Sequence, residues 1–250
     1  MTPLAKTFGY KCVDEQERER RIRRVFVAVA RRYDLMNDLL SLGVHRLWKR
    51  AMVRMAAPAP GQRIVDLAGG TGDVASRMAG PDRLVMVCDP SVPMMQAGRQ
   101  RQHRHLQWVA GSAERMPLAS ASVDTVTIAF GIRNVTHIEV ALKEVLRVLR
   151  PGGRFLCLEF STPAAPVRPL YNLFSFGVIP RLGALIASAP EAYTYLVESI
   201  RRFPDQRAFK ALLEQAGFAG VHWRNLSFGI ACIHSGSKPL SSPAGSADVR

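Results

Sequence analysis

Acidic and glycine residues cluster in the segment VDLAGGTGDVA, residues 65–75, in a pattern that could bind a nucleotide or a nucleoside. Asp66 lies near the end of an apolar run, and Gly69, Gly70 and Gly72 follow it. Glycines at the turn from a strand to a helix let the backbone bend sharply and approach a ligand without a Cβ in the way. The segment therefore predicts the binding site of a nucleotide or nucleoside cofactor.

A second carboxylate, Asp89, ends the next apolar run, RLVMVCD (83–89), and stands 19 residues after Gly70. At the end of a second strand a carboxylate can accept hydrogen bonds from both hydroxyls of a ribose. The alternative is a turn or helix-capping role for Asp89 ahead of Pro90. We favour the ribose interpretation, because the glycine segment already predicts a nucleoside.

The glycine segment alone does not separate two cofactors. GTGDVA (70–75) fits the loose G-x-G-x-x-A pattern of NAD(P)-binding oxidoreductases, which is a weak signal by itself. S-adenosylmethionine has no pyrophosphate, and carboxylates such as Asp66 suit its amino and sulfonium charges. Two later segments favour this cofactor: GSAERMP (111–117), whose backbone amides can bracket an adenine, and RVLRPGGRF (147–155), a helix–turn–strand pattern common in methyltransferases.

The elements that position these residues alternate between strands and helices. Five runs are mostly apolar along their whole length, as expected of strands inside a parallel sheet that is covered on both faces. Helical patterns, such as 73–80 and 139–150, lie between them, and this alternation predicts a doubly wound α/β sheet. A further helix is expected at 205–217, and two more strands at 220–227 and 229–236. The five apolar runs are RIVDLAG (63–69), RLVMVCD (83–89), HLQWVAG (105–111), VDTVTIAF (123–130) and GRFLCLEF (153–160).

The chain is expected to divide into three parts. Residues 1–58 are predicted to form an N-terminal helical segment. The Pro-, Ala- and Gly-rich stretch MAAPAPGQ (55–62) interrupts the helical pattern before the next element. Residues 59–236 form the main domain, in which the Pro- and aromatic-rich stretch 162–204 is an insertion before the last elements. The tail, residues 237–250, is expected to be disordered.

The formal net charge of the 250 residues is +14, which first suggests nucleic acid as a partner. Residues 1–60 hold 13 of the 34 basic groups and 6 of the 20 acidic groups, so half of the excess lies there. The segment 16–34 places Ile22, Val25 and Phe26 on one face among arginines, and predicts a basic amphipathic helix. Such a helix packs on its own domain with a solvated basic face, or it meets anionic lipid headgroups. No interleaved aromatics or RNP-like motifs accompany the charge, so nucleic acid is not expected.

The cysteines, the lack of a long apolar run and the N-terminus argue against metal-binding, membrane-spanning and secreted proteins. Cys12, Cys88, Cys157 and Cys232 stand far apart with no ligand spacing, so we expect reduced, buried and inert thiols and no metal site. The sequence has no run of 18 uncharged apolar residues, so no segment is expected to span a membrane. The N-terminus lacks the apolar core of a secretory signal, and we expect the chain to stay inside the cell.

Six motifs are spread in register along the chain: YDLMNDLLSLGVHRLWK (33–49), DLAGGTGD (66–73), FGIRNV (130–135), RVLRPGGRFLCLEFS (147–161), YTYLVESI (193–200) and FPDQ (203–206). They resemble the ubiquinone/menaquinone biosynthesis C-methyltransferase family over about residues 8–238. The resemblance implies an α/β, class I S-adenosylmethionine-dependent methyltransferase with a Rossmann-like, mostly parallel seven-stranded sheet. It further implies methyl transfer to a ring carbon of a polyprenylated quinol, either a demethylmenaquinol, a 2-polyprenyl-6-methoxy-1,4-benzoquinol or both. The alternatives are a non-catalytic scaffold of a quinone-synthesis complex and an NAD(P)-binding oxidoreductase.

By position in these motifs, the resemblance places Thr71 and Asp89 in contact with the cofactor, and Ser112 and Ala113 near its adenine. The chain departs from the family at two positions. The family usually has Asn or Asp in place of Ser112, so the adenine contact is expected to be weaker or to come from the backbone. It often has Ser in place of Ala129, so a side-chain contact is lost there. The expected cofactor-binding residues are Asp66, Gly69, Gly70, Thr71, Asp89, Ser112 and Ala113.

Methylation of a ring carbon requires an electron-rich ring, and a phenol becomes a better carbon nucleophile as it loses its proton, with an unperturbed pKa of about 10. The protein must therefore stabilise a phenolate-like oxygen or supply a base. Arg133 and Asn134 follow the fourth strand and can supply a cation and an amide at the edge where such sheets bind ligands. Tyr33 and His45 are expected to reach over the cofactor as proton-handling groups. The structural alternatives are an ion pair for Arg133 and helix packing for Tyr33 and His45.

The expected partners are a polyprenylated quinol and an anionic membrane surface. We expect the insertion and the basic N-terminal helix to line one mouth that faces the lipid. The alternative for the insertion is a lid that packs on its own core or on a second subunit, in a homodimer or a quinone-synthesis complex. We expect a bacterial cytoplasmic protein held at the inner face of the cytoplasmic membrane. The residues expected to form an apolar trough for the isoprenoid tail are Tyr171, Leu173, Phe174, Phe176, Val178 and Ile179.

Overall fold

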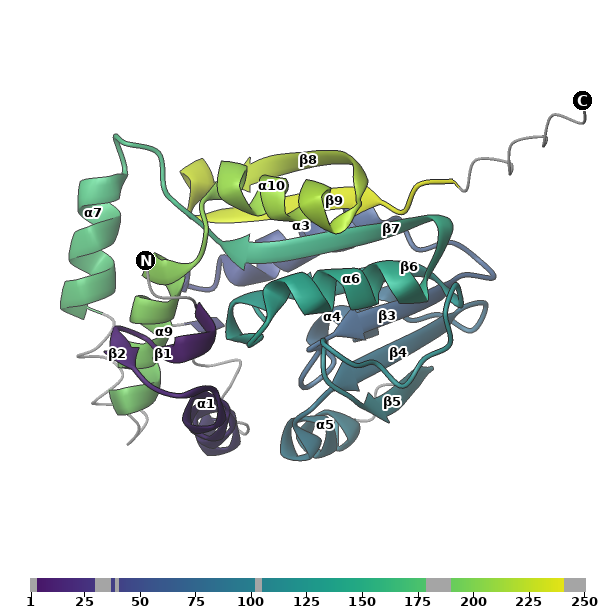
Figure 1. Ribbon diagram of the computed structural model, residues 1–250, viewed down its shortest axis with the longest axis horizontal. Helices are drawn as coiled ribbons and strands as arrows, with labels where there is room; N and C mark the ends of the chain where they lie inside the picture. The colour runs from purple at the N-terminus through teal and green to yellow at the C-terminus, as the bar shows by residue number, and fades with distance from the viewer. Residues whose placement is uncertain (1–3, 30–36, 39–40, 102–104, 179–189, 241–250) are drawn as a thin grey trace, which may run out of the picture.

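A seven-stranded sheet forms the centre of the protein in the computed structural model, which describes residues 4–29, 37–38, 41–101, 105–178 and 190–240 (Figure 1). Its strand order is β5-β4-β3-β6-β7-β9-β8. Neighbouring strands from β5 to β7 are parallel, whereas β9 is antiparallel to both β7 and β8. The expected mostly parallel α/β sheet is confirmed. The strands are β3 (Arg63–Leu67), β4 (Leu84–Asp89), β5 (Leu106–Ala110), β6 (Val123–Ala129), β7 (Leu149–Phe160), β8 (Ala219–Leu226) and β9 (Ala231–Ser237).

Helices cover both faces of the sheet, and each face has its own apolar core. On one face Met52 and Met78 pack against β3 and β4; on the other, Leu142 and Leu213 pack against β6 and β7. In Figure 1, α6 and α10 lie in front of the sheet, while α3 and α4 lie behind it. Burial on both faces explains why the parallel strands are apolar throughout. These helices are α3 (His45–Ala56), α4 (Asp73–Met78), α5 (Val92–Arg99), α6 (Ile138–Val148) and α10 (Gln206–Ala216).

The N-terminal segment differs from the expected run of helices. A short 3-10 helix, η1 (Leu4–Lys6), is followed by a two-stranded hairpin, β1 (Thr7–Phe8) and β2 (Lys11–Cys12), and only then by α1 (Glu15–Val29). The sequence gives little sign of this hairpin because each strand has two residues. Cys12, at its end, is exposed, so the expectation of a buried thiol is wrong there, whereas the other three cysteines are buried. Phe8 is buried by stacking on Tyr195, with 4.2 Å between ring centroids, so a contact distant in sequence holds the hairpin in place.

The insertion lies on the same side of the molecule as α1 (Figure 1). It contains α7 (Arg168–Asn172), a π-helical turn η4 (Leu173–Val178) and α9 (Pro190–Arg202), and α9 packs against α1. Among the described helices, none is both long and apolar enough to cross a membrane.

Several boundaries shift from their expected positions, and those of β7 and β9 have a clear cause. Strand β7 begins at Leu149 rather than 153, because Leu149 already pairs with Val123 of β6. Strand β9 includes Ser237, and the Lys238 amide then donates to the Gly153 carbonyl at 2.8 Å. Ordered structure therefore extends beyond residue 236 into the stretch predicted to be a disordered tail, of which residues 241–250 lie outside the described part.

Candidate functional site

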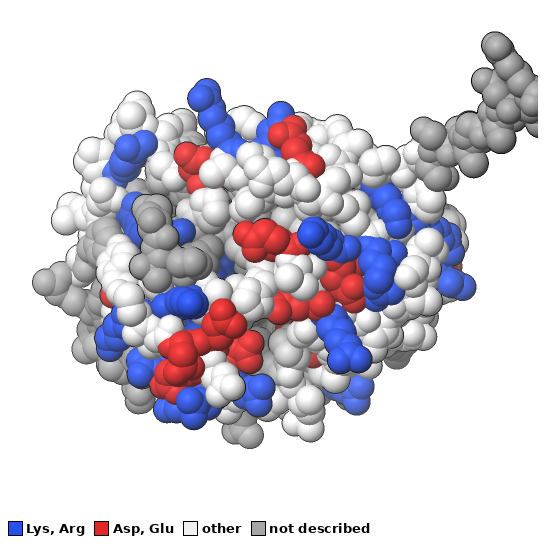
Figure 2. All heavy atoms as spheres, viewed as in Figure 1, with Lys and Arg blue, Asp and Glu red and all other residues white. Residues whose placement is uncertain are grey.

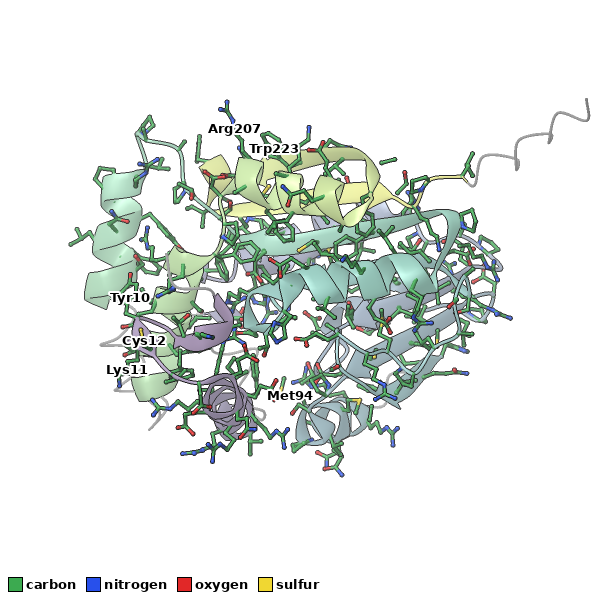
Figure 3. All side chains as sticks on the ribbon, viewed as in Figure 1. Tyr10, Lys11, Cys12, Met94, Arg207 and Trp223 are labelled. Carbon is green, nitrogen blue, oxygen red and sulfur yellow. The ribbon has the colours of Figure 1, made fainter. Side chains whose placement is uncertain are left out.

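A cavity of about 380 Å³ opens at the carboxyl ends of the parallel strands. It lies where β3 pairs with β4 on one side and with β6 on the other, which is the position at which open α/β sheets bind ligands. The loops after β3, β4, β5 and β6 line it, together with residues of α1 and α3. Met94 at the start of α5 belongs to the lining and lies between α1 and α5 in Figure 3.

The glycine loop after β3 forms one wall of this cavity. Gly70 has φ +56°, a left-handed conformation that favours glycine, and a Cβ there would come within 3.1 Å of Met94 Cε. The Gly70 amide donates to Asp89 Oδ2 at 2.8 Å, so the tip of the loop is tied to the end of β4. Gly69 and Thr71 line the same wall. The loop therefore presents backbone to a ligand, as the sequence predicted.

Asp89 holds two backbone amides at the rim of the cavity. Its Oδ2 accepts from Gly70 and its Oδ1 accepts from Ser91 at 2.7 Å. Burial raises the pKa of the Asp89 carboxyl, and the hydrogen bonds from Ser91 and Gly70 oppose that shift. The capping alternative is thus present in the structure, but a carboxylate has further lone pairs for ribose hydroxyls. The ribose role remains a prediction.

Asp66 lies deeper in the same wall. Its Oδ1 accepts from the Thr127 hydroxyl at 2.9 Å, and its Oδ2 accepts from the Ala75 amide at 3.1 Å. Burial raises the pKa of Asp66 to about 7, against the effect of these two hydrogen bonds. Asp66 thus ties β3 to β6 and to the start of α4 while it lines the cavity.

Ser112 and Ala113 lie at the end of the cavity beside β5. The Ser112 hydroxyl accepts from the Arg115 amide at 3.1 Å, so it closes its own turn. Ala113 is buried. This geometry suits an adenine that is contacted mainly by the backbone, as expected from the departure at Ser112. Ala129, the other departure, also lines the cavity and offers a methyl group.

The described lining is acidic. It contains five carboxylates against two cations, and in Figure 2 acidic side chains form a band between α1 and α6. This charge balance suits the sulfonium and amino groups of S-adenosylmethionine, and it would repel the pyrophosphate of a dinucleotide. The glycine loop and the carboxylates therefore fit S-adenosylmethionine. The five acidic residues are Glu19, Asp66, Asp73, Asp89 and Glu114, and the two basic residues are Arg23 and Lys49.

Arg133 and Asn134 occupy different environments although they are adjacent. Arg133 lies beneath the loop in a buried ion pair, with Nη1 at 2.7 Å from Glu159 Oε1 and bonded to the Phe130 carbonyl, and it is not part of the cavity lining. Asn134 does line the cavity, and its Oδ1 accepts from the Tyr195 hydroxyl at 2.9 Å. The structure therefore brings Asn134 to the cofactor cavity and places Arg133 behind it.

His45 and Tyr33 are not brought to the described cavity. His45 Nε2 lies 2.8 Å from Asp38 Oδ1 at the start of α3, and His45 is not among the lining residues. Burial lowers the pKa of His45, and Lys49 adds to this effect. Tyr33 lies outside the described residues. Proton handling by His45 and Tyr33 stays a prediction.

Helix α1 covers one side of the cavity, a position that its amphipathic pattern did not predict. Ile22 and Phe26, on its apolar face, line the cavity. Arg18 fixes the helix: it is buried and donates to the backbone carbonyls of Thr7, Arg133 and Asn134, and to the Thr136 hydroxyl. The residues around Arg18 in sequence do not distinguish it from the other arginines of α1, because its acceptors come mostly from a loop more than a hundred residues away.

The insertion offers mixed support for an apolar trough. Tyr171 is buried, and Phe174 packs partly against the core. Leu173 and its neighbour Leu170 are 69% and 72% exposed. The side chains of Phe176 and Val178, and Ile179 as a whole, lie outside the described residues.

Solved structures share this fold. An S-adenosylmethionine-dependent methyltransferase from Thermotoga maritima superposes with a TM-score of 0.60 at 22% identity, covering 87% of this chain and 99% of that one. Phosphoethanolamine N-methyltransferase 2 from Haemonchus contortus, solved with S-adenosylmethionine, superposes with a TM-score of 0.59 at 13% identity, covering 77% and 52%. The fold is therefore that of the class I S-adenosylmethionine-dependent methyltransferases, and the acid-lined cavity fits their cofactor.

Sequence comparison narrows the class to one family. Residues 14–238 match the ubiE/COQ5 methyltransferase family, and the chain belongs to it. A ubiquinone/menaquinone biosynthesis C-methyltransferase from Rubrivivax gelatinosus is 69% identical over 98% of both chains. The resemblance seen in the sequence is thereby confirmed, S-adenosylmethionine is the methyl donor, and the reading of GTGDVA as a dinucleotide site is set aside.

Proposed function

We propose that this protein transfers the methyl group of S-adenosylmethionine to a ring carbon of a polyprenylated quinol in the synthesis of ubiquinone, menaquinone or both. The observation that carries the proposal is the 69% identity to the Rubrivivax C-methyltransferase over nearly the whole chain. A cavity that fits a nucleoside with cationic groups supports it.

Asn134 is the group that we assign to the quinol oxygen. Its Nδ2 faces the Phe130 carbonyl at 3.5 Å, and a carbonyl can only accept, so the Oδ1 faces Tyr195 and the Tyr195 hydroxyl must donate. This arrangement leaves an N–H donor for the cavity. A donor there stabilises the negative charge that grows on a phenol oxygen as the ring attacks the methyl group.

Incubation of the purified protein with methyl-labelled S-adenosylmethionine and each reduced quinol tests this function. We expect label in the ring of the benzoquinol, the naphthoquinol or both, because both carry a phenol that can ionise. The matched control is the oxidised quinone, which has no phenolic proton to lose and should accept no methyl group. Absence of transfer to both quinols would contradict the proposal and favour a non-catalytic scaffold.

We further propose that the protein binds anionic membrane surfaces peripherally at the inner face of the cytoplasmic membrane. The support is the exposure of Arg20, Arg23 and Arg24 on α1 and of Leu170 and Leu173 on the same side of the molecule. The buried Arg18 does not contribute, so fewer charges are available than the sequence suggests. A second copy of this chain, or another protein of a quinone-synthesis complex, is the alternative partner for the two leucines.

Vesicle flotation tests the electrostatic contribution. We expect binding to vesicles with anionic lipid and weaker binding to neutral ones. The double variant Arg20→Gln/Arg24→Gln should lose about 30-fold, because each basic group near the surface contributes about 1 kcal/mol. Arg207→Gln/Arg224→Gln removes the same charge from α10 and β8, and Arg207 points away from α1 in Figure 3. Equal binding to both vesicle types, or equal effects of the two variants, would rule out the role of α1.

A further inference from the structure

The methionine end of S-adenosylmethionine poses a charge problem for this cavity. The cofactor carries a sulfonium and an ammonium, which suit the acidic lining, but it also carries a carboxylate, which the same lining repels. We propose that the Lys49 ammonium, held in place by Asp73, binds this carboxylate. The inference rests on the methyl donor that the proposed function requires, and it does not depend on which quinol is methylated.

Lys49 projects from α3 toward the glycine loop. Its side chain is 5% exposed, it lines the cavity, and its Nζ lies 2.8 Å from Asp73 Oδ2. An ammonium has three N–H donors. Among the described residues, Asp73 is the only hydrogen-bond partner of this Nζ, so donors remain for a ligand.

The charges around Lys49 favour an anion. Asp73 is also bound by Arg77, whose Nη2 lies 3.0 Å from Asp73 Oδ1, so two cations share one carboxylate. Burial works against ionisation of Asp73, but Lys49 and Arg77 together outweigh it and the pKa of Asp73 is lowered. Asp66 has a pKa raised to about 7, so it is only about half ionised at neutral pH and cancels only part of the excess. The three charged groups Lys49, Asp73 and Arg77 therefore leave about one net positive charge beside the cavity.

The position of Lys49 is fixed before any ligand binds. Its neighbour Trp48 packs among Phe130 and Phe160, and the Trp48 indole donates to the Ser227 hydroxyl at 2.9 Å. Arg23, the other basic residue of the lining, lies on the exposed side of α1. A buried cation on a helix that packs on the sheet costs little to order, whereas an exposed arginine would lose side-chain entropy on binding.

Calorimetry with two ligands separates this role from a structural one. S-adenosylmethionine has the carboxylate, and decarboxylated S-adenosylmethionine is the same molecule without it. We expect Lys49→Met to weaken binding of the first about 10- to 100-fold, the range of a charge-assisted hydrogen bond, and to change binding of the second less than about threefold. Lys49→Arg, which keeps the cation, should retain most of the preference for the carboxylate.

The control variant is Arg50→Met, which removes an exposed cation of α3 that is not part of the lining, and it should leave the affinity for both ligands unchanged. An equal loss of both ligands in Lys49→Met would overturn the inference and leave Lys49 as a structural partner of Asp73. If Lys49→Met does not fold, Lys49→Arg decides, because loss of the carboxylate preference there with the cation retained would also overturn it. Failure of the wild-type protein to bind either ligand would instead refute the methyl donor and the proposed function with it.

Discussion

Asp89→Ala is expected to weaken the binding of S-adenosylhomocysteine about 100- to 10,000-fold, since two hydrogen bonds to a charged acceptor contribute about 1.5–3 kcal/mol each. The carboxylate now orders the Gly70 and Ser91 amides at the cavity rim, and it would accept the ribose hydroxyls when the cofactor binds. Calorimetry measures the loss directly, without any need for the quinol.

The control for Asp89→Ala is Asp82→Ala, which removes a carboxylate from the loop before β4, where Asp82 pairs with Arg83 away from the cavity. It should leave affinity unchanged. A 2′-deoxy analogue of S-adenosylhomocysteine separates the two roles of Asp89. Wild-type protein should discriminate against it, and Asp89→Ala should not. If the variant still discriminates, Asp89 acts only by tethering the glycine loop.

The parts of this protein that sequence predicts well are those with local causes. Strands β3 to β7 are apolar because helices cover both faces, and that pattern is visible in any window of the chain. The glycine loop and Asp89 are equally local, because a left-handed turn needs glycine at Gly70 and an acid at a strand end needs no distant partner to be recognised. The sheet, its switch point and the cofactor cavity follow from these features.

The parts that sequence predicts poorly depend on partners far along the chain. The amphipathic pattern of α1 indicates a basic helix, but it does not say that Ile22 and Phe26 face the cofactor. Nor does it distinguish the buried Arg18 from the exposed Arg20 and Arg24, since the groups that receive the Arg18 hydrogen bonds include residues 133, 134 and 136. A charge count therefore overstates the basic surface of this helix.

Arg133 is a second residue whose role depends on a partner that is distant in sequence. An arginine that follows a strand beside the binding site is a reasonable candidate for a substrate contact. Its ion-pair partner, Glu159, lies 26 residues further along the chain, and only the fold brings Arg133 Nη1 to 2.7 Å from Glu159 Oε1. Both side chains are buried, at 5% and 2% exposure. The pair holds the loop from Phe130 to Asn134, which makes Arg133 a positioning residue for Asn134 in this geometry.

Arg133→Met is therefore expected to lower the free energy of unfolding by about 3–5 kcal/mol, because it leaves the Glu159 carboxylate buried without its partner. Chemical denaturation measures this change. The double variant Arg133→Met/Glu159→Leu should recover most of the loss, since an apolar pair of similar volume often replaces a buried ion pair at little cost. A single variant as stable as the wild type would contradict the importance of the pair.

The destabilisation should also depend on pH, in a direction that the Glu159 carboxyl determines. Burial already raises the pKa of Glu159 although Arg133 opposes it, and removal of Arg133 raises that pKa further. A folded-state pKa above the unfolded value favours the folded state at low pH, and that contribution is lost as the pH rises through the folded-state pKa. The penalty of Arg133→Met should thus be smaller at pH 5 than at pH 8, and the double variant should show no such trend. In both variants turnover should fall at least tenfold while the affinity for S-adenosylmethionine changes little, because the loop of Asn134 has lost the arginine that fixes it.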